Sequence, residues 1–503
     1  MLSEETRNKI LKPIKLNKII KDNYDFIFLF IFLFSLILGT YYLTQTYNQA
    51  LWFDEADYLN FGKYVAFGSP EWGLGSVRPP LFPIISALFF KIGLGEIGLR
   101  ILMLLFYLSN VLLIYLIGKE LLNKKAGIVA SIVTAVFWSH LFFSFRMLVD
   151  VPVLTFWLLT TYLFVYGYIN NKSRLAVKLI LPVLFIGFLF KYLNAVLGII
   201  ILLYLLITER LNFIKNKGLQ LSVLITAIMT IPFFLFQYFY YKNPIAFLTT
   251  SLGDRTTLGK TFTDFLILNI QQLTPMVSYT FVIILIIGLV RLFEIFLGLD
   301  LIIKNKNTEL SKKFFLFLWL IISLIFISKI GFGYYIEERY SFMLFAAMFL
   351  IIGIGLDWLY EIIKKHNKVL SLIIITLIII FGAYQNLSKA DNLIKDKAES
   401  FKQVKQAGQF LESHLEHNQG YLSPATSAEI QYHSNRKNFG SDIKNYLNDT
   451  KVKYVVLSGF NQMPEGYTKF IQENQKIFNP VAVYYIDKEQ KQPIVIIFEI
   501  IRN

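Results

Sequence analysis

The sequence predicts a mostly α-helical, polytopic membrane bundle with a small C-terminal α/β domain outside the membrane. Of the 503 residues, 55% are hydrophobic and 17% are aromatic, and the mean hydropathy is +0.54. Such a composition is typical of membrane proteins and not of soluble domains. Long apolar segments follow one another as far as residue 386, and the hydropathy falls sharply after it.

The first element is a basic N-terminal segment, residues 1–24, which we expect to be cytoplasmic. Its lysine and arginine residues precede the first long apolar run, and a small-residue cleavage site is missing. These features favour an uncleaved anchor over a signal peptide. With this end inside, the first loop, residues 46–79, lies outside.

We expect eleven spans within a transmembrane domain formed by residues 25–387. They cover about 25–45, 98–118, 126–144, 150–169, 176–191, 192–208, 219–239, 275–298, 314–330, 339–362 and 368–386. A shorter apolar helix at 79–92 is marginal for spanning and is expected at the outer surface. Every loop that this count places inside holds a basic cluster, such as Lys119, Lys124 and Lys125, as the positive-inside bias requires.

The last element is a soluble extracytoplasmic α/β domain, residues 388–503. Apolar spacing predicts a helix over about 399–415, and strand-like runs cover 454–457, 481–486 and 493–500. His414, His417 and His433 lack convincing ligand spacing and are expected at the surface. We identify no catalytic pattern in this domain.

Composition also excludes several classes of chemistry. The chain has no cysteine, which rules out disulfides, thiolate nucleophiles and Cys-ligated metals. Its net charge of +15 fits cytoplasmic loops held against anionic lipid headgroups, so we expect no nucleic-acid partner.

Ionisable residues from five parts of the chain converge on the predicted outer surface. Each has a simpler explanation alone, because an acid can cap a helix and a lysine or arginine can reach the headgroups. Together they describe a water-accessible polar cavity, and acids at a membrane boundary are candidate site residues. The set comprises Asp54, Glu55, Arg78, Asp150, Lys191, Glu337, Glu338 and Arg339.

Carboxylates and bases at an interface suit chemistry on a lipid phosphate. Arginine and lysine neutralise phosphate oxygens and the charge that grows on a departing phosphate, and a carboxylate can take the proton of an attacking hydroxyl. Glycosyl transfer from a polyprenyl phosphate needs only one carboxylate, whereas a glycosidase needs a second one to protonate its leaving group. Because nucleotide sugars are cytoplasmic, a sugar donor used outside must be delivered by the membrane.

Six stretches of the chain resemble a known family. They are WFDEADYL at 52–59, RPPLFPIISALFFKIG at 78–93, the run from GLRILM to AVFW at 98–138, FRMLVDVPVLTFWLL at 145–159, GFLFKYLNAVLG at 187–198 and ERYSFMLFAAM at 338–348. Their order and spacing over residues 45–350 are similar to integral-membrane glycosyltransferases with the GT-C fold. The similarity is greatest to the superfamily of dolichyl-phosphate-mannose–protein mannosyltransferases and aminoarabinose transferases.

The resemblance implies an inverting glycosyltransferase that moves a hexosyl or pentosyl sugar from a polyprenyl phosphate, dolichyl or undecaprenyl, to a hydroxyl acceptor at the outer membrane face. The acceptor is a protein, a lipid or a glycan. Asp54 corresponds to the catalytic base with Glu55 beside it, and Asp150 to a second outer-loop acid. The implied ligands of the donor are Arg78, Asp150, Lys191, Tyr192, Arg339 and Tyr340.

The chain departs from the family pattern at two places. Asn194 stands where members often have a small residue, and the usual proline after Arg339-Tyr340 is missing.

Three questions stay open at the level of sequence. No cofactor is certain, and Asp54, Glu55 and Asp150 leave room for a divalent cation, although the base role alone accounts for these carboxylates. A transporter or flippase of lipid-linked or small polar substrates is the alternative; its charges would lie near the midplane of two repeated halves. A ligase or polymerase of lipid-linked glycans is a further reading within the enzyme class.

Overall fold

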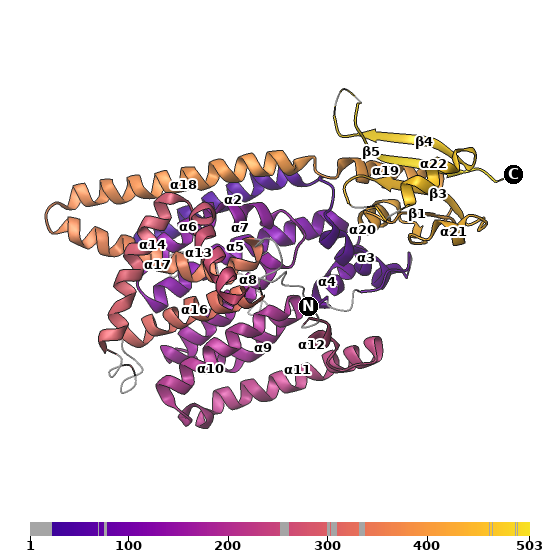
Figure 1. Cartoon of the computed structure of the whole chain (residues 1–503). Helices are drawn as coiled ribbons and strands as arrows, with labels where there is room; N and C mark the ends of the chain where they lie inside the picture. The colour runs from indigo at the N-terminus through magenta and orange to yellow at the C-terminus, as the bar shows by residue number, and fades with distance from the viewer. Residues whose placement is uncertain are drawn as a thin grey trace, which may run out of the picture.

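The computed structural model describes residues 23–502 except 69, 75–77, 252–260, 299–301, 303–308, 331–337, 462, 465, 488 and 490. A helical bundle is followed by a smaller domain that contains one sheet (Figure 1). Most of the basic N-terminal segment and Glu337 lie outside the described residues.

Nine helices of the described residues are long and apolar enough to cross a membrane, and a bent pair makes ten. The nine are α2 (Asn23–Thr46), α5 (Gly95–Leu121), α8 (Asp150–Leu163) with η2 (Phe164–Ile169), η3 (Tyr192–Asn194) with α10 (Ala195–Glu209), α11 (Lys217–Tyr241), α14 (Tyr279–Leu292) with η5 (Phe293–Gly298), α16 (Glu309–Ile330), η6 (Glu338–Ser341) with α17 (Phe342–Lys364), and α18 (Lys368–Ala398). The bent pair is α6 (Lys124–Val136) with α7 (Trp138–Ser144), at 55°. With α9 (Arg174–Phe190), each predicted span has a helical counterpart, and the protein is a multi-pass membrane protein.

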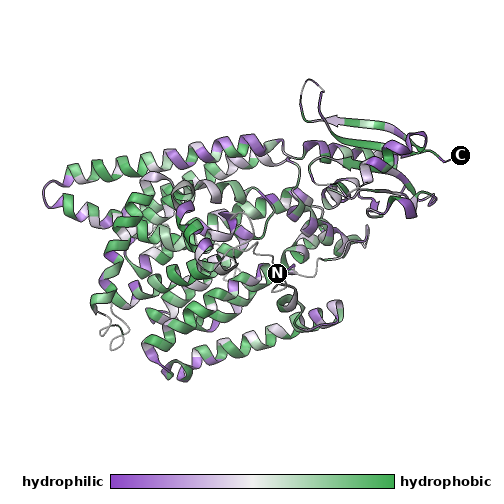
Figure 2. Ribbon diagram, viewed as in Figure 1, coloured by the Kyte–Doolittle hydropathy of each residue, from purple (hydrophilic) through white to green (hydrophobic). Residues whose placement is uncertain are grey.

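Helix α17 occupies the centre of the bundle, since every side chain from Phe342 to Leu356 is buried. Its neighbours approach closely: a Cβ added at Gly353 would lie 2.6 Å from the backbone oxygen of Ala126 on α6. Small residues permit such backbone contacts between membrane helices. The outer helices instead expose apolar side chains, and the ribbon of α11 and of much of α18 is coloured hydrophobic in Figure 2. This is expected of surfaces that face lipid.

The predicted outer loop 46–79 contains a helix that we did not predict, α3 (Phe53–Phe67). It is too polar to span, and its apolar residues pack on α4 (Leu81–Lys91), the expected short surface helix. The predicted span at 275–298 also began too early. Helix α13 (Phe262–Val277) ends there, the backbone turns at Ser278 with φ of 85°, and the span itself starts at Tyr279.

The C-terminal part has the predicted α/β character. Its sheet has the order β2-β1-β3-β5-β4, from β1 (Gly420–Leu422), β2 (Lys437–Asn438), β3 (Val452–Ser458), β4 (Phe478–Tyr485) and β5 (Pro493–Ile500). β1 pairs in parallel with β2 and β3, and β5 runs antiparallel to β3 and β4. Helices α19 (Lys402–His414), α20 (Ser427–Ser434), α21 (Ile443–Tyr446) and α22 (Tyr467–Glu473) complete it. Helix α18 continues through the predicted boundary at 387 and leads into this part of the chain (Figure 1).

The C-terminal domain docks on α3 through α20, which lies between α19 and α3 (Figure 1). Asn60 Nδ2 donates to the backbone oxygen of Ala428 at 2.8 Å, and Lys63 Nζ donates to that of Tyr432 at 2.8 Å. Because α20 is covered on both sides, His433 is only 9% exposed. The predicted surface position is therefore wrong for this histidine.

Candidate active site

Six charged side chains meet at the end of the bundle where α3 lies. Helix α3 places Asp54 and Asp57 one turn apart, so that both face the same side. Arg78 precedes the two prolines before α4, and Asp150 lies in the first turn of α8, where a carboxylate is favoured by the helix dipole. Lys191 occupies an extended residue between α9 and η3, and Arg339 lies in η6.

These side chains form an unbroken chain of alternating charge. Arg78 Nε lies 2.5 Å from Asp57 Oδ2, and Arg78 Nη2 lies 2.6 Å from Asp54 Oδ1. Arg339 bridges the next two acids, with Nη2 2.8 Å from Asp54 Oδ2 and Nη1 3.7 Å from Asp150 Oδ2. Lys191 Nζ closes the chain at 2.5 Å from Asp150 Oδ1. Three cations and three carboxylates balance within one cluster, which we call the ion-pair chain.

Tyrosine rings cover the cations of the ion-pair chain. Lys191 Nζ lies 4.1 Å from the centre of the Tyr340 ring, and the Arg78 guanidinium lies 4.8 Å from that of Tyr58. Such cation–π contacts hold a charge in a partly desolvated position. Tyr192 donates its hydroxyl to the backbone oxygen of Arg78 at 3.5 Å, so both tyrosines expected near the site are present there.

Asp54 is the carboxylate of the ion-pair chain that is most open to an incoming group. Its side chain is 28% exposed, compared with 9% for Asp57 and 2% for Asp150. Burial raises the pKa of Asp54, but the charges of Arg78 and Arg339 outweigh burial and hold the pKa below its ordinary value. Asp54 is therefore ionised at neutral pH and can accept a proton.

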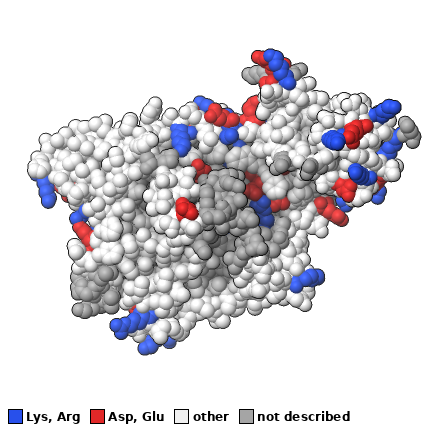
Figure 3. Space-filling model, in the orientation of Figure 1, with Lys and Arg blue, Asp and Glu red and all other residues white. Residues whose placement is uncertain are grey.

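A small cavity adjoins the other end of the ion-pair chain. Asp150, Lys191, Arg339 and Tyr340 line it on the polar side, and Trp157 is among its apolar lining residues. Figure 3 shows that charged side chains gather at the ends of the bundle and over the C-terminal domain, while the face between them is largely uncharged. The cavity thus joins the charged end of the ion-pair chain to apolar side chains.

Glu55 does not face the ion-pair chain, and its expected place beside Asp54 in the site needs correction. Consecutive helical residues point roughly 100° apart, and Glu55 is fully buried on the other side of α3. It accepts hydrogen bonds from the backbone nitrogens of Trp52 at 2.8 Å and Met147 at 2.7 Å, and lies 3.4 Å from Arg146 Nη1. Glu55 therefore fastens the start of α3 to the segment between α7 and α8.

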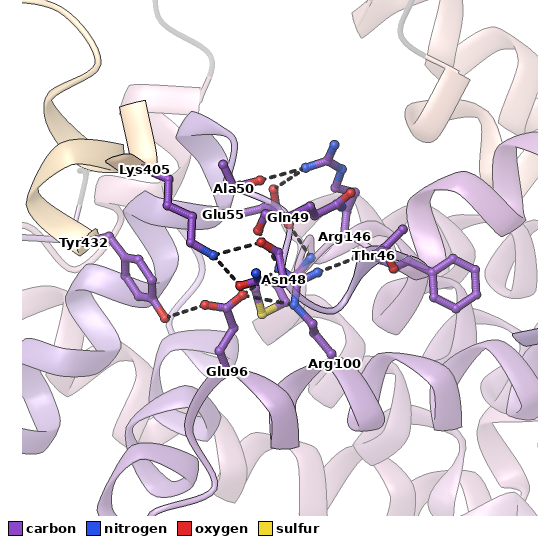
Figure 4. A network of polar contacts seen from close by, with 12 residues as sticks. Thr46, Asn48, Gln49, Ala50, Glu55, Glu96, Arg100, Arg146, Lys405 and Tyr432 are labelled. Carbon is purple, nitrogen blue, oxygen red and sulfur yellow. Dashed lines mark hydrogen bonds and ion pairs between the residues drawn. The ribbon is translucent and has the colours of Figure 1, made fainter. Parts of the chain in front are cut away.

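The Glu55 contacts belong to a network that reaches the C-terminal domain (Figure 4). Arg100 Nη2 lies 2.7 Å from Glu96 Oε1 and donates to the backbone oxygen of Gln49 at 3.1 Å. Tyr432 of α20 donates to Glu96 at 3.3 Å, and Lys405 of α19 donates to the backbone oxygen of Asn48 at 2.8 Å. These contacts tie the residues just before α3 to α5 and to the C-terminal domain.

The divalent-cation site that the sequence left open does not fit these residues. Asp54 and Asp150 are engaged by arginine and lysine, and Glu55 points elsewhere. In the described ranges, no three acidic or histidine side chains are grouped so as to hold a metal ion. We therefore derive no step through a metal.

Glu55→Gln should mainly lower stability. Arg146 is 1% exposed, and loss of a buried partner charge costs about 3 kcal/mol. We expect a lower melting temperature in detergent, with the catalytic rate per folded molecule within a few-fold of the native rate. Glu361→Gln, at the more exposed ion pair between α17 and Lys125 of α6, is the control. A normal melting temperature combined with a large loss of rate would instead place Glu55 in the chemistry.

The sequence interpretation missed Asp57 and Tyr58. A signal was available for Asp57, because it follows Asp54 by three residues and a helix brings such residues together. Residues 46–79 were predicted to be a loop, and in a loop a spacing of three residues does not bring side chains together. Tyr58 is one of 29 tyrosines, and nothing in the sequence marks it as a neighbour of Arg78.

The chain is similar to known glycosyltransferases. Residues 77–236 match the family model of dolichyl-phosphate-mannose-protein mannosyltransferase, and no curated protein sequence matches significantly. The fold is similar to that of ArnT from Cupriavidus metallidurans bound to undecaprenyl phosphate, with a TM-score of 0.67 and 12% identity over 93% of this chain and 97% of that one.

Two further structures have the same fold. The oligosaccharyltransferase AglB from Archaeoglobus fulgidus, in complex with an inhibitory peptide and a dolichol-phosphate, gives a TM-score of 0.58 and 11% identity over 92% and 73% of the two chains. Arabinofuranosyltransferase AftD from mycobacteria gives 0.57 and 10% over 95% and 40%. The predicted GT-C fold and the resemblance to this class of membrane glycosyltransferases are confirmed.

Proposed function

We propose that this protein transfers a hexosyl or pentosyl sugar from a polyprenyl phosphate, dolichyl or undecaprenyl, to a hydroxyl acceptor, with inversion, at the extracytoplasmic face of the membrane. The observation that carries the proposal is the ion-pair chain, in which Asp54 lies between Arg78 and Arg339 beside an otherwise apolar bundle. Two similar structures support the choice of donor, because one is bound to undecaprenyl phosphate and the other is in complex with a dolichol-phosphate.

Without a donor, the cations of the ion-pair chain are neutralised by its own carboxylates. A donor phosphate would compete for Arg78, Lys191 and Arg339, since a charge-assisted hydrogen bond to phosphate is strong. When one of these cations binds the phosphate, the carboxylate that it contacted loses an ion-pair partner. Donor binding would therefore raise the basicity of Asp54 at the moment when a base is needed.

The chemical step then uses groups that the ion-pair chain supplies. The acceptor oxygen attacks the anomeric carbon of the sugar, and its proton passes to the Asp54 carboxylate. The bond from the anomeric carbon to the phosphate oxygen breaks on the opposite face, which inverts the configuration. The polyprenyl phosphate departs as an anion, and the positive charges of Lys191 and Arg339 stabilise the charge that develops on it.

A transporter is less consistent with this arrangement. Transport sites lie near the bilayer midplane between repeated halves, whereas the ion-pair chain joins α3, α8, η6 and the start of η3 at one end of the bundle. The experiment that separates the two is transfer of a radiolabelled sugar by the purified protein. In a panel of synthetic polyprenyl-phosphate sugars that includes mannose, at least one should be consumed, while the nucleotide-linked forms of the same sugars should not. If none of the lipid-linked sugars is consumed, the proposal is overturned.

The proposal requires that the ion-pair chain and the C-terminal domain lie outside. The chain lacks native cysteine, so single cysteines can be introduced at exposed positions in turn. A membrane-impermeant thiol reagent applied to intact cells should label Ser441→Cys in the C-terminal domain and spare Lys215→Cys in the loop between α10 and α11. Permeabilised cells, in which both should react, provide the control. The reverse pattern would place Asp54 in the cytoplasm and remove the reason for preferring a lipid-linked donor.

A further inference from the structure

Glu429, on the α20 helix of the C-terminal domain, is a buried carboxyl with an unsatisfied oxygen. The residue is 1% exposed, and its Oε2 atom has no hydrogen-bond partner in the described part of the chain. A buried polar atom without a partner is costly, and the few in native structures require an explanation such as a bound ligand or water.

A second unsatisfied acceptor lies at the same junction. Asn60 of α3 is 2% exposed; it donates Nδ2 to the backbone oxygen of Ala428, the residue before Glu429, while its own Oδ1 atom lacks a partner among the described residues. Asn60 follows Asp57 by three residues, so these two side chains are neighbours on the surface of α3. The junction is therefore one helical turn from Asp57 of the ion-pair chain and on the side of the C-terminal domain.

The charge of Glu429 is linked to the ion-pair chain. Burial raises the pKa of Glu429 to about 7, and the carboxylates of Asp54 and Asp57 also raise it. A carboxyl that is protonated for part of the time can both accept and donate a hydrogen bond. In its protonated form the Glu429 carboxyl is neutral and needs no buried counter-ion. Neutral hydrogen-bonding groups are therefore better partners for it than a cation.

The segment before Arg78 closes the third side of the junction. Trp72 Nε1 donates to Asp57 Oδ1 at 2.8 Å, and Gln431 Nε2 of α20 donates to the backbone oxygen of Glu71 at 3.2 Å. The junction thus lies between α3, α20 and residues 71–72, and Trp72 connects it to Asp57 of the ion-pair chain.

We propose that Glu429 and Asn60 form a subsite for the acceptor, and that the acceptor is a saccharide. The inference rests on the proposed glycosyl transfer. Two buried acceptor oxygens call for at least two hydrogen-bond donors in addition to the hydroxyl that loses its proton to Asp54. A seryl or threonyl side chain has only that one hydroxyl, whereas a sugar carries several neighbouring ones. The C-terminal domain then supplies part of the acceptor recognition.

The test uses the full-length protein in detergent with synthetic polyprenyl-phosphate mannose as donor. An alkyl disaccharide and a serine-containing peptide serve as acceptor probes in separate reactions. Native protein should transfer to the disaccharide. Glu429→Ala should raise the KM for the disaccharide by roughly tenfold, the loss of one buried hydrogen bond, with the KM for the donor within about twofold. Glu429→Gln, which keeps an acceptor oxygen, should restore most of the affinity.

Glu416→Ala, at an exposed carboxylate of the same domain, is the matched control and should change neither KM. Transfer to the peptide alone, transfer to neither probe while the donor is consumed, or an unchanged disaccharide KM in Glu429→Ala would each overturn the inference. Failure of the native protein to consume any lipid-linked donor would overturn the proposed function itself, so the two failures can be told apart.

Discussion

Asp54→Asn should lower the rate of sugar transfer by at least ~100-fold, the usual scale of general-base catalysis. Asparagine keeps an oxygen for the arginines but cannot take the proton of the acceptor hydroxyl. The fold should survive, because Arg78 retains Asp57 and Arg339 retains Asp150 as partners. Donor binding should not be weakened, since none of the cations is removed and one competing carboxylate charge is lost. Single-turnover transfer with labelled donor, together with a separate donor-binding measurement, checks both statements.

The control for this substitution is Asp391→Asn. Asp391 forms an ion pair with Lys395 on α18, and its side chain is 32% exposed, similar to that of Asp54. It has no contact with the ion-pair chain among the interactions of the described residues. It should transfer at the native rate. If Asp54→Asn keeps more than a tenth of native activity, Asp54 is not the base. Asp57, the other α3 carboxylate of the ion-pair chain, would then be the next candidate.

The bundle was predictable because a hydrophobic span is a long, local signal. About twenty apolar residues in a row stand out without any knowledge of their neighbours, and all eleven expected spans correspond to helices. The short elements carry no such signal. β1 and β2 have three and two residues. Helix α3 mixes polar and apolar residues without an apolar stripe, and it packs against α4 and α20.

Five of the six residues of the ion-pair chain were predicted from the sequence, but their pairing was not. The sequence places Asp54, Arg78, Asp150, Lys191 and Arg339 at one membrane face, and the structure brings them into contact. The direction of each side chain depends on tertiary packing. Glu55 therefore turned out to be a buried structural residue, and Glu429, more than 350 residues away in sequence, lies next to α3.

Arg339→Met should lower turnover by roughly 100-fold or more and also weaken donor binding, because one positive charge is lost at the leaving phosphate. Arg339→Lys should be almost as poor. The guanidinium reaches Asp54 with one nitrogen and Asp150 with the other, and a lysine offers a single point charge that cannot span the two. Lys191→Met should resemble Arg339→Met, since Lys191 holds the other oxygen of Asp150.

The matched control for the loss of an arginine charge is Arg291→Met, at the exposed pair with Glu294 on α14 and η5. Its donor affinity and rate should be native. Measuring donor binding and single-turnover rate for each variant separates the two effects: a phosphate ligand affects both, whereas a residue that only orients Asp54 affects the rate alone. If Arg339→Met and Lys191→Met both bind and use the lipid-phosphate donor normally, the phosphate lies elsewhere, and the ion-pair chain merely joins the helices at this end of the bundle.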